Sequence, residues 1–231
     1  MLIREQDRSG LEVFMMRRTT KAAFAGGMYV FPGGAVDAED SSFEVAAIRE
    51  CFEEAGVLLA CSLTGEIIRL DEPDLCQRFT SYRHEVHAGR RSMTSVLETE
   101  QLIPMVDQLR WVSHWVTPFG EVRRFDTRFY LTAMPPDQDP LHDDLETVDS
   151  LWVAPGDALM RARRGELLML PPTMVNLEFL ADHKNVDDAL AAVEQVGTPQ
   201  KILPKVRWGV DGRIEALLMP GDAGYDDIPE L

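Results

Sequence analysis

The sequence predicts an α/β protein in which a mixed β-sheet lies between helices. Segments rich in aromatic and β-branched residues mix with helical segments, without the regular strand–helix alternation of a parallel sheet. No internal repeat and no long Gly/Ser linker divides the chain. We therefore expect one domain spanning residues 1–231, and the hydrophobic content of 45% is ordinary for a globular protein with a full core.

The first half of the chain predicts two strands, a capped helix and a helical insertion. "LEVFMMRRTT" is apolar and ends in basic residues, and "MYVFPGG" enters a turn, so both are expected as strands, with the start of the chain close to the first. Residues 41–60 have helical spacing, with Ser41 or Ser42 as N-cap and Gly56 as the closing residue. Residues from about 72 to 103 keep helical spacing without strand alternation, which predicts a helical insertion.

The second half predicts β-strands followed by further helices. Strands are expected in "LRWVSHWVTP", "RRFDTRFYLTAMP" and "ETVDSLWVAP". Extra C-terminal helices are expected over 155–165, 173–183 and 186–196. A short strand in "GRIEALLM" then precedes an acidic, Gly-rich tail.

Composition and charge exclude several classes of protein. No run of about 18 apolar residues exists, and "MLIREQDRSG" lacks the apolar stretch of a secretory signal, so we expect no membrane segment. The three cysteines form no CxxC pair and indicate reduced thiols in the cytoplasm. The net charge of −16 argues against a nucleic acid polymer as partner, whereas a small phosphorylated substrate stays compatible if a metal reverses the local charge.

Three glutamates fall on one face of the predicted helix 41–60. At about 100° per residue, Glu50, Glu53 and Glu54 lie together, while the opposite face is apolar and can pack on a sheet. Such like charges repel, and a divalent cation such as Mg²⁺ or Mn²⁺ removes the repulsion. A solvated acidic face is the alternative for the glutamates alone. The preceding Gly33–Gly34 turn permits close approach of a ligand, and the Gly33 carbonyl offers one more oxygen.

The stretch from Gly34 to Val57 resembles the Nudix box, G-x5-E-x7-R-E-U-x-E-E-x-G-U, in which U is a bulky apolar residue. "RECFEEAGV" matches the second half, whereas the first half departs from it: the expected glutamate falls on Asp40, and eight residues separate it from Arg49. Asp40 can still be the acid partner of Arg49. The upstream "VFMMRRTTKAAFAGGMYVFPGG" looks like the segment that precedes the box in coenzyme A diphosphatases. The resemblance implies the Nudix fold, an α/β/α sandwich.

The resemblance also implies a mechanism, the hydrolysis of a diphosphate linked to another group. Glu50, Glu53 and Glu54, with the Gly33 carbonyl, would bind Mg²⁺ (or Mn²⁺), which activates a water for attack on phosphorus. Arg49 would point away from the metal and orient a glutamate. In many members an acid on a loop before a late strand is the general base. Glu146 occupies such a place, and Asp143, Asp144 and Asp149 have nearly equal claims.

Basic and aromatic residues outside the box are candidates for substrate contacts. Arg17 and Arg18, with Gly34 where the box opens, are assigned to substrate binding, because guanidinium groups suit phosphates. Pairing with surface acids is the alternative for these arginines. Other candidates are arginines on predicted strands and three aromatic residues able to stack on a base, for which core packing is favoured: Arg123, Arg124, Arg128, Trp111, Trp115 and Phe125.

Two further features have non-catalytic explanations. "HEVH" at 84–87 lacks the spacing and the third ligand of a zinc site, so a solvated helix face is preferred. Cys51 falls on the apolar side of the helix, where we expect a core residue with a raised pKa rather than a nucleophile.

The sequence thus predicts a Mg²⁺-dependent pyrophosphohydrolase acting on a small diphosphate of the nucleotide type. Coenzyme A or an acyl derivative is the first expectation, with nucleotide sugars, ADP-ribose and dinucleoside polyphosphates open. A Nudix-like binding or sensor module that holds such a ligand without cleaving it is the alternative. A third alternative, a protein-interaction domain, is supported only by the helical insertion. The sequence leaves open whether the protein forms a homodimer.

Overall fold

The computed structural model describes residues 1–7, 10–22, 24–120, 123–143, 145–209, 211 and 213–229. The helices are α1 Phe43–Ala55, α2 Pro73–His87, α3 Met93–Glu100, the 3-10 turn η1 Val106–Gln108, α4 Pro155–Arg163, α5 Pro171–Ala181 and α6 Val186–Val196. The strands are β1 Leu2–Gln6, β2 Gly10–Arg18, β3 Tyr29–Val30, β4 Ala60–Ser62, β5 Leu102–Pro104, β6 Arg110–Val116, β7 Asp126–Ala133, β8 Thr147–Val153, β9 Lys201–Ile202, β10 Lys205–Trp208 and β11 Ile214–Leu218.

The main sheet is mixed, as predicted. Strand β2 pairs antiparallel with β1, β3 and β8, while β1 pairs parallel with β7 and β6 pairs parallel with β9. The pairs β4–β5 and β10–β11 are separate antiparallel two-stranded sheets. The long strand β2 therefore brings β3 and β8 together at its C-terminal end, next to Arg17 and Arg18.

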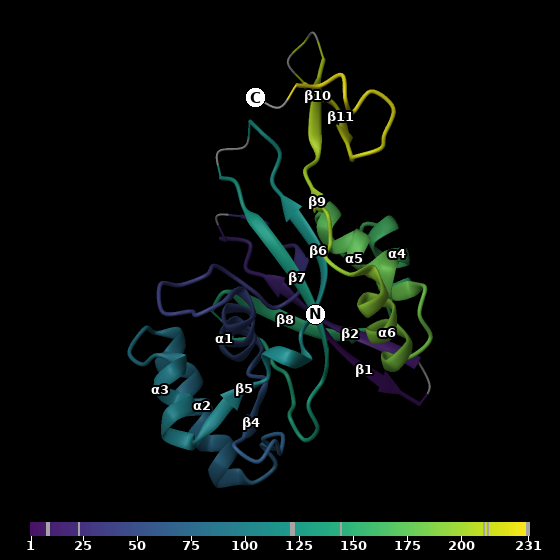
Figure 1. Ribbon diagram of the computed structural model, residues 1–231. Helices are drawn as coiled ribbons and strands as arrows, with labels where there is room; N and C mark the ends of the chain where they lie inside the picture. The colour runs from purple at the N-terminus through teal and green to yellow at the C-terminus, as the bar shows by residue number, and fades with distance from the viewer. Residues whose placement is uncertain are drawn as a thin grey trace.

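Helices cover both faces of the main sheet (Figure 1). Successive side chains of a strand point to opposite faces, and β2 is buried on both. Phe14 and Met16 belong to the core that contains α1, whereas Val13 and Met15 belong to the core shared with α4, α5 and α6. The predicted α/β/α arrangement is confirmed, and it places α1 directly over the sheet.

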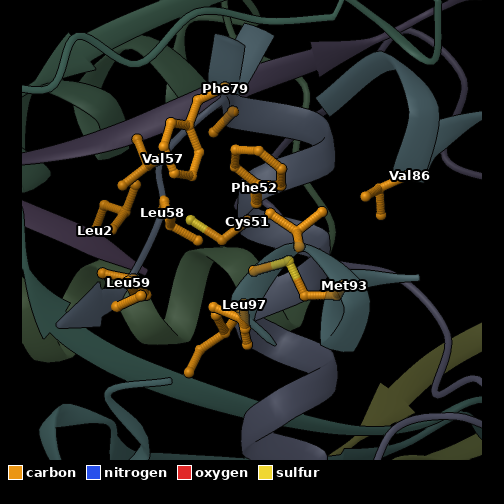
Figure 2. Packing of buried hydrophobic residues seen from close by; sticks show 14 of the residues in the cluster. Leu2, Cys51, Phe52, Val57, Leu58, Leu59, Phe79, Val86, Met93 and Leu97 are labelled. Carbon is orange, nitrogen blue, oxygen red and sulfur yellow. The ribbon is translucent and has the colours of Figure 1, made fainter. Parts of the chain in front are cut away.

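Helix α1 has the caps that its sequence predicts. The Ser42 hydroxyl accepts a hydrogen bond from the Val45 N–H at 3.2 Å, and Gly56 ends the helix in the left-handed conformation with φ 71°. The apolar face of α1 packs against the two helices expected between 72 and 103. Figure 2 shows Phe52 beside Phe79 of α2, and their ring centroids are 6.4 Å apart.

Cys51 is a buried member of this core, as predicted. Burial, more than the charge of Glu54, raises the pKa of its thiol to about 12, so the thiol is inert at neutral pH.

Some predicted elements differ in the structure. Helix α1 ends at Ala55, as the predicted closing residue Gly56 implies, so the rest of the segment 41–60 is not helical. Arg123 and Arg124 precede β7 instead of lying on it. No separate strand was expected for β1, which pairs with both β2 and β7, or for the β4–β5 pair. Among the described residues no helix has the length and apolar character needed to cross a membrane. The single domain of 1–231 stays a prediction.

Candidate active site

The three glutamates of α1 lie together at the end of the helix that faces the Phe31–Gly34 turn. Glu54 is nearly buried, 3% exposed, and its Oε2 accepts a hydrogen bond from the Gly33 N–H at 2.9 Å. Glu50 and Glu53 both accept hydrogen bonds from Nη1 of Arg49, at 3.0 and 2.9 Å. One guanidinium group therefore orients two of the three acids.

Burial makes this acid cluster costly to ionise. Burial, together with the charges of neighbouring glutamates, raises the pKa of Glu50 to about 7 and that of Glu54 to about 8. Among the described residues, no group of three or more acidic, His or Cys side chains is arranged to hold a metal ion. The donor chemistry nevertheless fits Mg²⁺ or Mn²⁺, because carboxylate oxygens are what these ions bind and a cation would offset the mutual repulsion.

Arg49 is buried and bonded through all three of its nitrogens. Nη2 and Nε contact the Asp40 carboxylate at 2.8 and 3.1 Å, and Nη2 also donates to the Ala35 carbonyl at 2.7 Å. Asp40 is thus the acid partner of Arg49, although the chain between them is one residue longer than the motif. The arginine ties α1 to the loop before it and fixes Glu50 and Glu53.

The two glycines of the turn have different roles: Gly33 adopts an unusual backbone angle, and Gly34 leaves room for a carboxylate. Gly33 has φ +154°, which side chains rarely adopt, and this turns its N–H toward Glu54. A Cβ on Gly34 would lie 2.5 Å from Oε1 of Glu50. Gly34 was assigned to substrate, and the structure places it against the Glu50 carboxylate. Gly33, assigned through its carbonyl, contacts Glu54 through its N–H.

Arg18, at the end of β2, reaches the same cluster. Its Nη1 lies 3.8 Å from Oε1 of Glu54, and its Nη2 lies 3.4 Å from Oε2 of Glu146. Its Nε is buried and has no hydrogen-bond partner within the described part of the chain. A buried donor without a partner is costly, so Arg18 is suited to an anionic ligand. Arg17 is more exposed and lies 3.9 Å from Asp149.

The acids before and within β8 differ in how far they are already engaged. Asp143 accepts hydrogen bonds from the N–H groups of Leu145, Glu146 and Thr147. Burial alone would raise its pKa, but these bonds hold it below the usual value, which suits a turn-forming residue. Asp149 accepts from the Tyr29 hydroxyl at 2.9 Å. Glu146 is half exposed and faces Arg18, and Asp144 lies outside the described residues.

Comparison with known proteins agrees with this arrangement. The family model of the NUDT19 Nudix domain matches residues 39–180. The chain belongs to the Nudix hydrolase family. It is 31% identical over 228 residues to "putative nudix hydrolase 7" of Caenorhabditis elegans, covering 95% of this chain and 71% of that protein.

Two further relatives support the same family. Human "acyl-coenzyme A diphosphatase NUDT19" is 31% identical over 204 residues, covering 81% of this chain and 52% of the human protein. The crystal structure of a Nudix hydrolase from Alicyclobacillus acidocaldarius superimposes with a TM-score of 0.69 at 26% identity, covering 82% of this chain and 92% of that one. The Nudix assignment and the fold expected from the box are confirmed.

Other residues considered from sequence lie away from the Nudix acids or pack internally. Trp115 is buried, as expected, whereas core packing was wrong for Phe125, which is exposed and packs against the exposed Phe24 with ring centroids 4.7 Å apart. Arg128 stacks over Phe43 and Trp111 at 3.7 and 4.8 Å. These contacts give the aromatic residues and Arg128 a packing role.

Two residues of α2 reach the Nudix helix, Arg83, which was not among the candidates, and His87, which was expected on a solvated face. Arg83 donates to the carbonyls of Glu53 and Glu54, and Nδ1 of His87 lies 3.9 Å from Oε2 of Glu53. His87 also lines a cavity of about 600 Å³ between α1, residues 37–40 and the α2–α3 connection, together with Arg49 and Glu53. The second histidine of "HEVH" therefore approaches an acid of the box instead of lying on a solvated face.

Proposed function

We propose that the protein is a divalent-metal-dependent pyrophosphohydrolase of small diphosphates. The observation that carries the proposal is the cluster of Glu50, Glu53 and Glu54 on one end of α1, held by Arg49 and by the Gly33 N–H. These carboxylates and the Gly33 carbonyl would hold Mg²⁺ or Mn²⁺. When bound, the cation supplies charge neutralisation for the diphosphate and lowers the pKa of the attacking water.

The chain's own residues have separate tasks in this proposal. Arg49 holds Glu50 and Glu53 in place, so the acids need little reorganisation during the reaction. Glu146 accepts the proton of the attacking water, since its carboxylate is half exposed while Asp143 is engaged in its own turn. Arg18 offers its partnerless Nε to a phosphate oxygen, and Arg17, which lies 3.9 Å from Asp149, is a second candidate for a phosphate contact.

We infer that coenzyme A or an acyl-coenzyme A is the substrate class. The human relative is named an acyl-coenzyme A diphosphatase, and its similarity covers 81% of this chain. The segment from Phe14 to Gly34, which resembles the corresponding segment of such enzymes, carries Arg18 next to Glu54 and also carries Arg17. The unpaired thiols of the three cysteines suit a reducing compartment such as the cytoplasm.

A hydrolysis screen tests both levels of the proposal. The purified chain is incubated with coenzyme A, acetyl-coenzyme A, ADP-ribose, a nucleotide sugar and a dinucleoside polyphosphate, each with Mg²⁺, with Mn²⁺ and with EDTA. We expect metal-dependent release of 3′,5′-ADP and phosphopantetheine from coenzyme A, identified by product mass.

The outcomes separate the substrate from the class of reaction. Turnover of another diphosphate with coenzyme A inert would overturn the substrate class and keep the hydrolase. Absence of turnover throughout, with binding of coenzyme A retained in calorimetry, would replace the hydrolase by a binding module.

A further inference from the structure

The C-terminal end of α1 is held by groups from outside the helix. The last four carbonyls of a helix have no partner within it, and in α1 these belong to Phe52, Glu53, Glu54 and Ala55. The Gly56 N–H donates to the Phe52 carbonyl at 3.0 Å, as the helix cap. The other three receive hydrogen bonds from distant parts of the chain, so the position of the Nudix acids depends on those parts.

One arginine of α2 supplies two of these three bonds. Nε of Arg83 donates to the Glu53 carbonyl at 2.8 Å, and Nη2 donates to the Glu54 carbonyl at 2.7 Å. The residues whose backbone it holds carry two of the three box acids. Helix α1 has no basic residue in its last turn, where the helix dipole is negative, so the Arg83 guanidinium also supplies the missing positive charge.

The same guanidinium reaches the connection between β7 and β8. Nη2 of Arg83 donates to the Leu141 carbonyl at 2.9 Å, and the Leu141 N–H donates to the Ala55 carbonyl at 3.0 Å. Two residues further on, Asp143 closes the turn that leads into Glu146. Arg83 therefore bridges the helix that carries the box acids and the segment that leads to the proposed base.

Gly56 leaves the space that the Arg83 side chain occupies. A Cβ there would lie 2.9 Å from Nη1 of Arg83. The glycine that lets the backbone turn at the end of α1 therefore also leaves room for the guanidinium to lie against the helix terminus.

We propose that Arg83 is a positioning residue, through which the helical insertion sets the box acids of α1 against the β7–β8 connection. The inference rests on the proposed function, because it assumes that Glu53 and Glu54 bind metal and that Glu146 acts with them. The hydrogen bonds of Arg83 described above go to backbone carbonyls and not to the carboxylates of Glu53 and Glu54. It acts on the backbone that carries them, and small displacements of that backbone move all the acids together.

The test compares Arg83→Gln and Arg83→Lys with Arg78→Ala. Arg78 lies on the same helix and forms a two-nitrogen pair with Glu100, so its loss removes an arginine of α2 without touching α1. Affinity for Mn²⁺ is measured by electron paramagnetic resonance. Steady-state assays on the substrate found in the screen give kcat and KM, and calorimetry gives Tm. Every binding and rate measurement is made well below the Tm of the variant concerned.

We expect Arg83→Gln to lose affinity for Mn²⁺ by about tenfold, as for other residues that orient metal ligands. Its kcat should fall by roughly tenfold to a hundredfold with a smaller change in KM. Arg83→Lys should have a Mn²⁺ affinity and a kcat between those of the wild type and Arg83→Gln, because one ammonium group cannot span three carbonyls in the same geometry. Arg78→Ala should match the wild type in Mn²⁺ affinity and kcat.

Other outcomes overturn the inference or the function it rests on. A lowered Tm with wild-type Mn²⁺ affinity and kcat would reduce Arg83 to a structural residue. If Arg83→Gln does not fold, Arg83→Lys decides, and wild-type values in that variant would also refute positioning. A wild-type protein that binds no Mn²⁺ would overturn the proposed metal site itself, a failure distinguishable from that of Arg83.

Discussion

Replacement of Glu54 by glutamine should stabilise the metal-free protein while removing its response to metal. The carboxylate is buried, receives one hydrogen bond from the Gly33 N–H, and lies where burial and the charges of Glu50 and Glu146 raise its pKa to about 8. A glutamine keeps the shape and can accept the same hydrogen bond through its amide oxygen. The substitution therefore removes a buried like charge without opening a cavity.

The size of the gain follows from the raised pKa. Each pKa unit corresponds to about 1.36 kcal/mol, so a lone acid with this pKa would cost the fold about 4 kcal/mol near pH 7.5. The ionisation of Glu54 is coupled to that of Glu50 and Glu146, so protonation of either neighbour relieves part of the repulsion. We therefore expect Glu54→Gln to recover about half of this cost, roughly 2 kcal/mol. For a chain of this length, this is a rise in Tm of roughly 4–8 °C.

The sign of the pH dependence is also fixed. The pKa of Glu54 is higher in the folded state than its value of about 4.3 in the unfolded chain. Its contribution to the free energy of unfolding is therefore fully present below about pH 4.3 and is lost as the pH rises toward about 8. The advantage of Glu54→Gln over the wild type in EDTA should therefore grow between about pH 5 and about pH 8.

Calorimetry with and without Mn²⁺ measures both effects. The wild type should gain about 2.7 kcal/mol at a hundredfold excess of Mn²⁺ over Kd, whereas Glu54→Gln should gain little and lose most turnover. Glu44→Gln is the matched control in the first turn of the same helix. Burial alone would raise the pKa of Glu44, but the Tyr130 hydroxyl and Arg128 hold it low, so this substitution should destabilise. A lower Tm for Glu54→Gln than for the wild type in EDTA near pH 8 would refute the reasoning.

Three further substitutions test other parts of the site. Gly34→Ala places a Cβ against the Glu50 carboxylate and should weaken Mn²⁺ binding by about tenfold in calorimetric titration, with little change in circular dichroism. Arg49→Lys cannot contact Asp40, the Ala35 carbonyl and the glutamates at once, so kcat should fall by roughly tenfold to a hundredfold in steady-state assays. Arg17→Ala should raise KM for coenzyme A more than it lowers kcat, and an unchanged KM would remove Arg17 from the substrate site.

Local patterns explain why α1 could be predicted in detail. The period of its apolar residues, the Ser42 cap and the Gly56 terminator all act within one helix, so the sequence carries the whole signal. The apolar run after Gly56 is not helical and leads into β4, and a short apolar run does not distinguish helix from strand. Strand β1 was missed because only Leu2 and Ile3 are apolar and buried, and its pairing with β7 joins residues far apart in the chain.

In the candidate site, too, contacts within the motif could be predicted, whereas contacts from other elements could not. The acids, Arg49 and the glycine turn lie within one motif, and their mutual contacts follow from its spacing. The contacts of Arg83 left no signal, because its acceptors are backbone carbonyls, which every residue has. His87 was assigned to a solvated face because sequence alone does not show which helix packs beside α2.

The charge balance of the site explains how the fold tolerates buried acids at the negative end of a helix. Three arginines from three elements surround the cluster: Arg18 from β2, Arg49 from α1 and Arg83 from α2. Arg18 and Arg49 face six carboxylates, namely Asp37, Asp40, Glu50, Glu53, Glu54 and Glu146, whereas Arg83 bonds backbone carbonyls at the helix end. Carboxylates therefore outnumber the arginines, and burial opposes the ionisation of the excess by raising the pKa of Glu50 to about 7 and that of Glu54 to about 8. A bound divalent cation would favour their charged forms. The arginines thus keep the acids in place, and the remaining charge favours a cation in the site we propose.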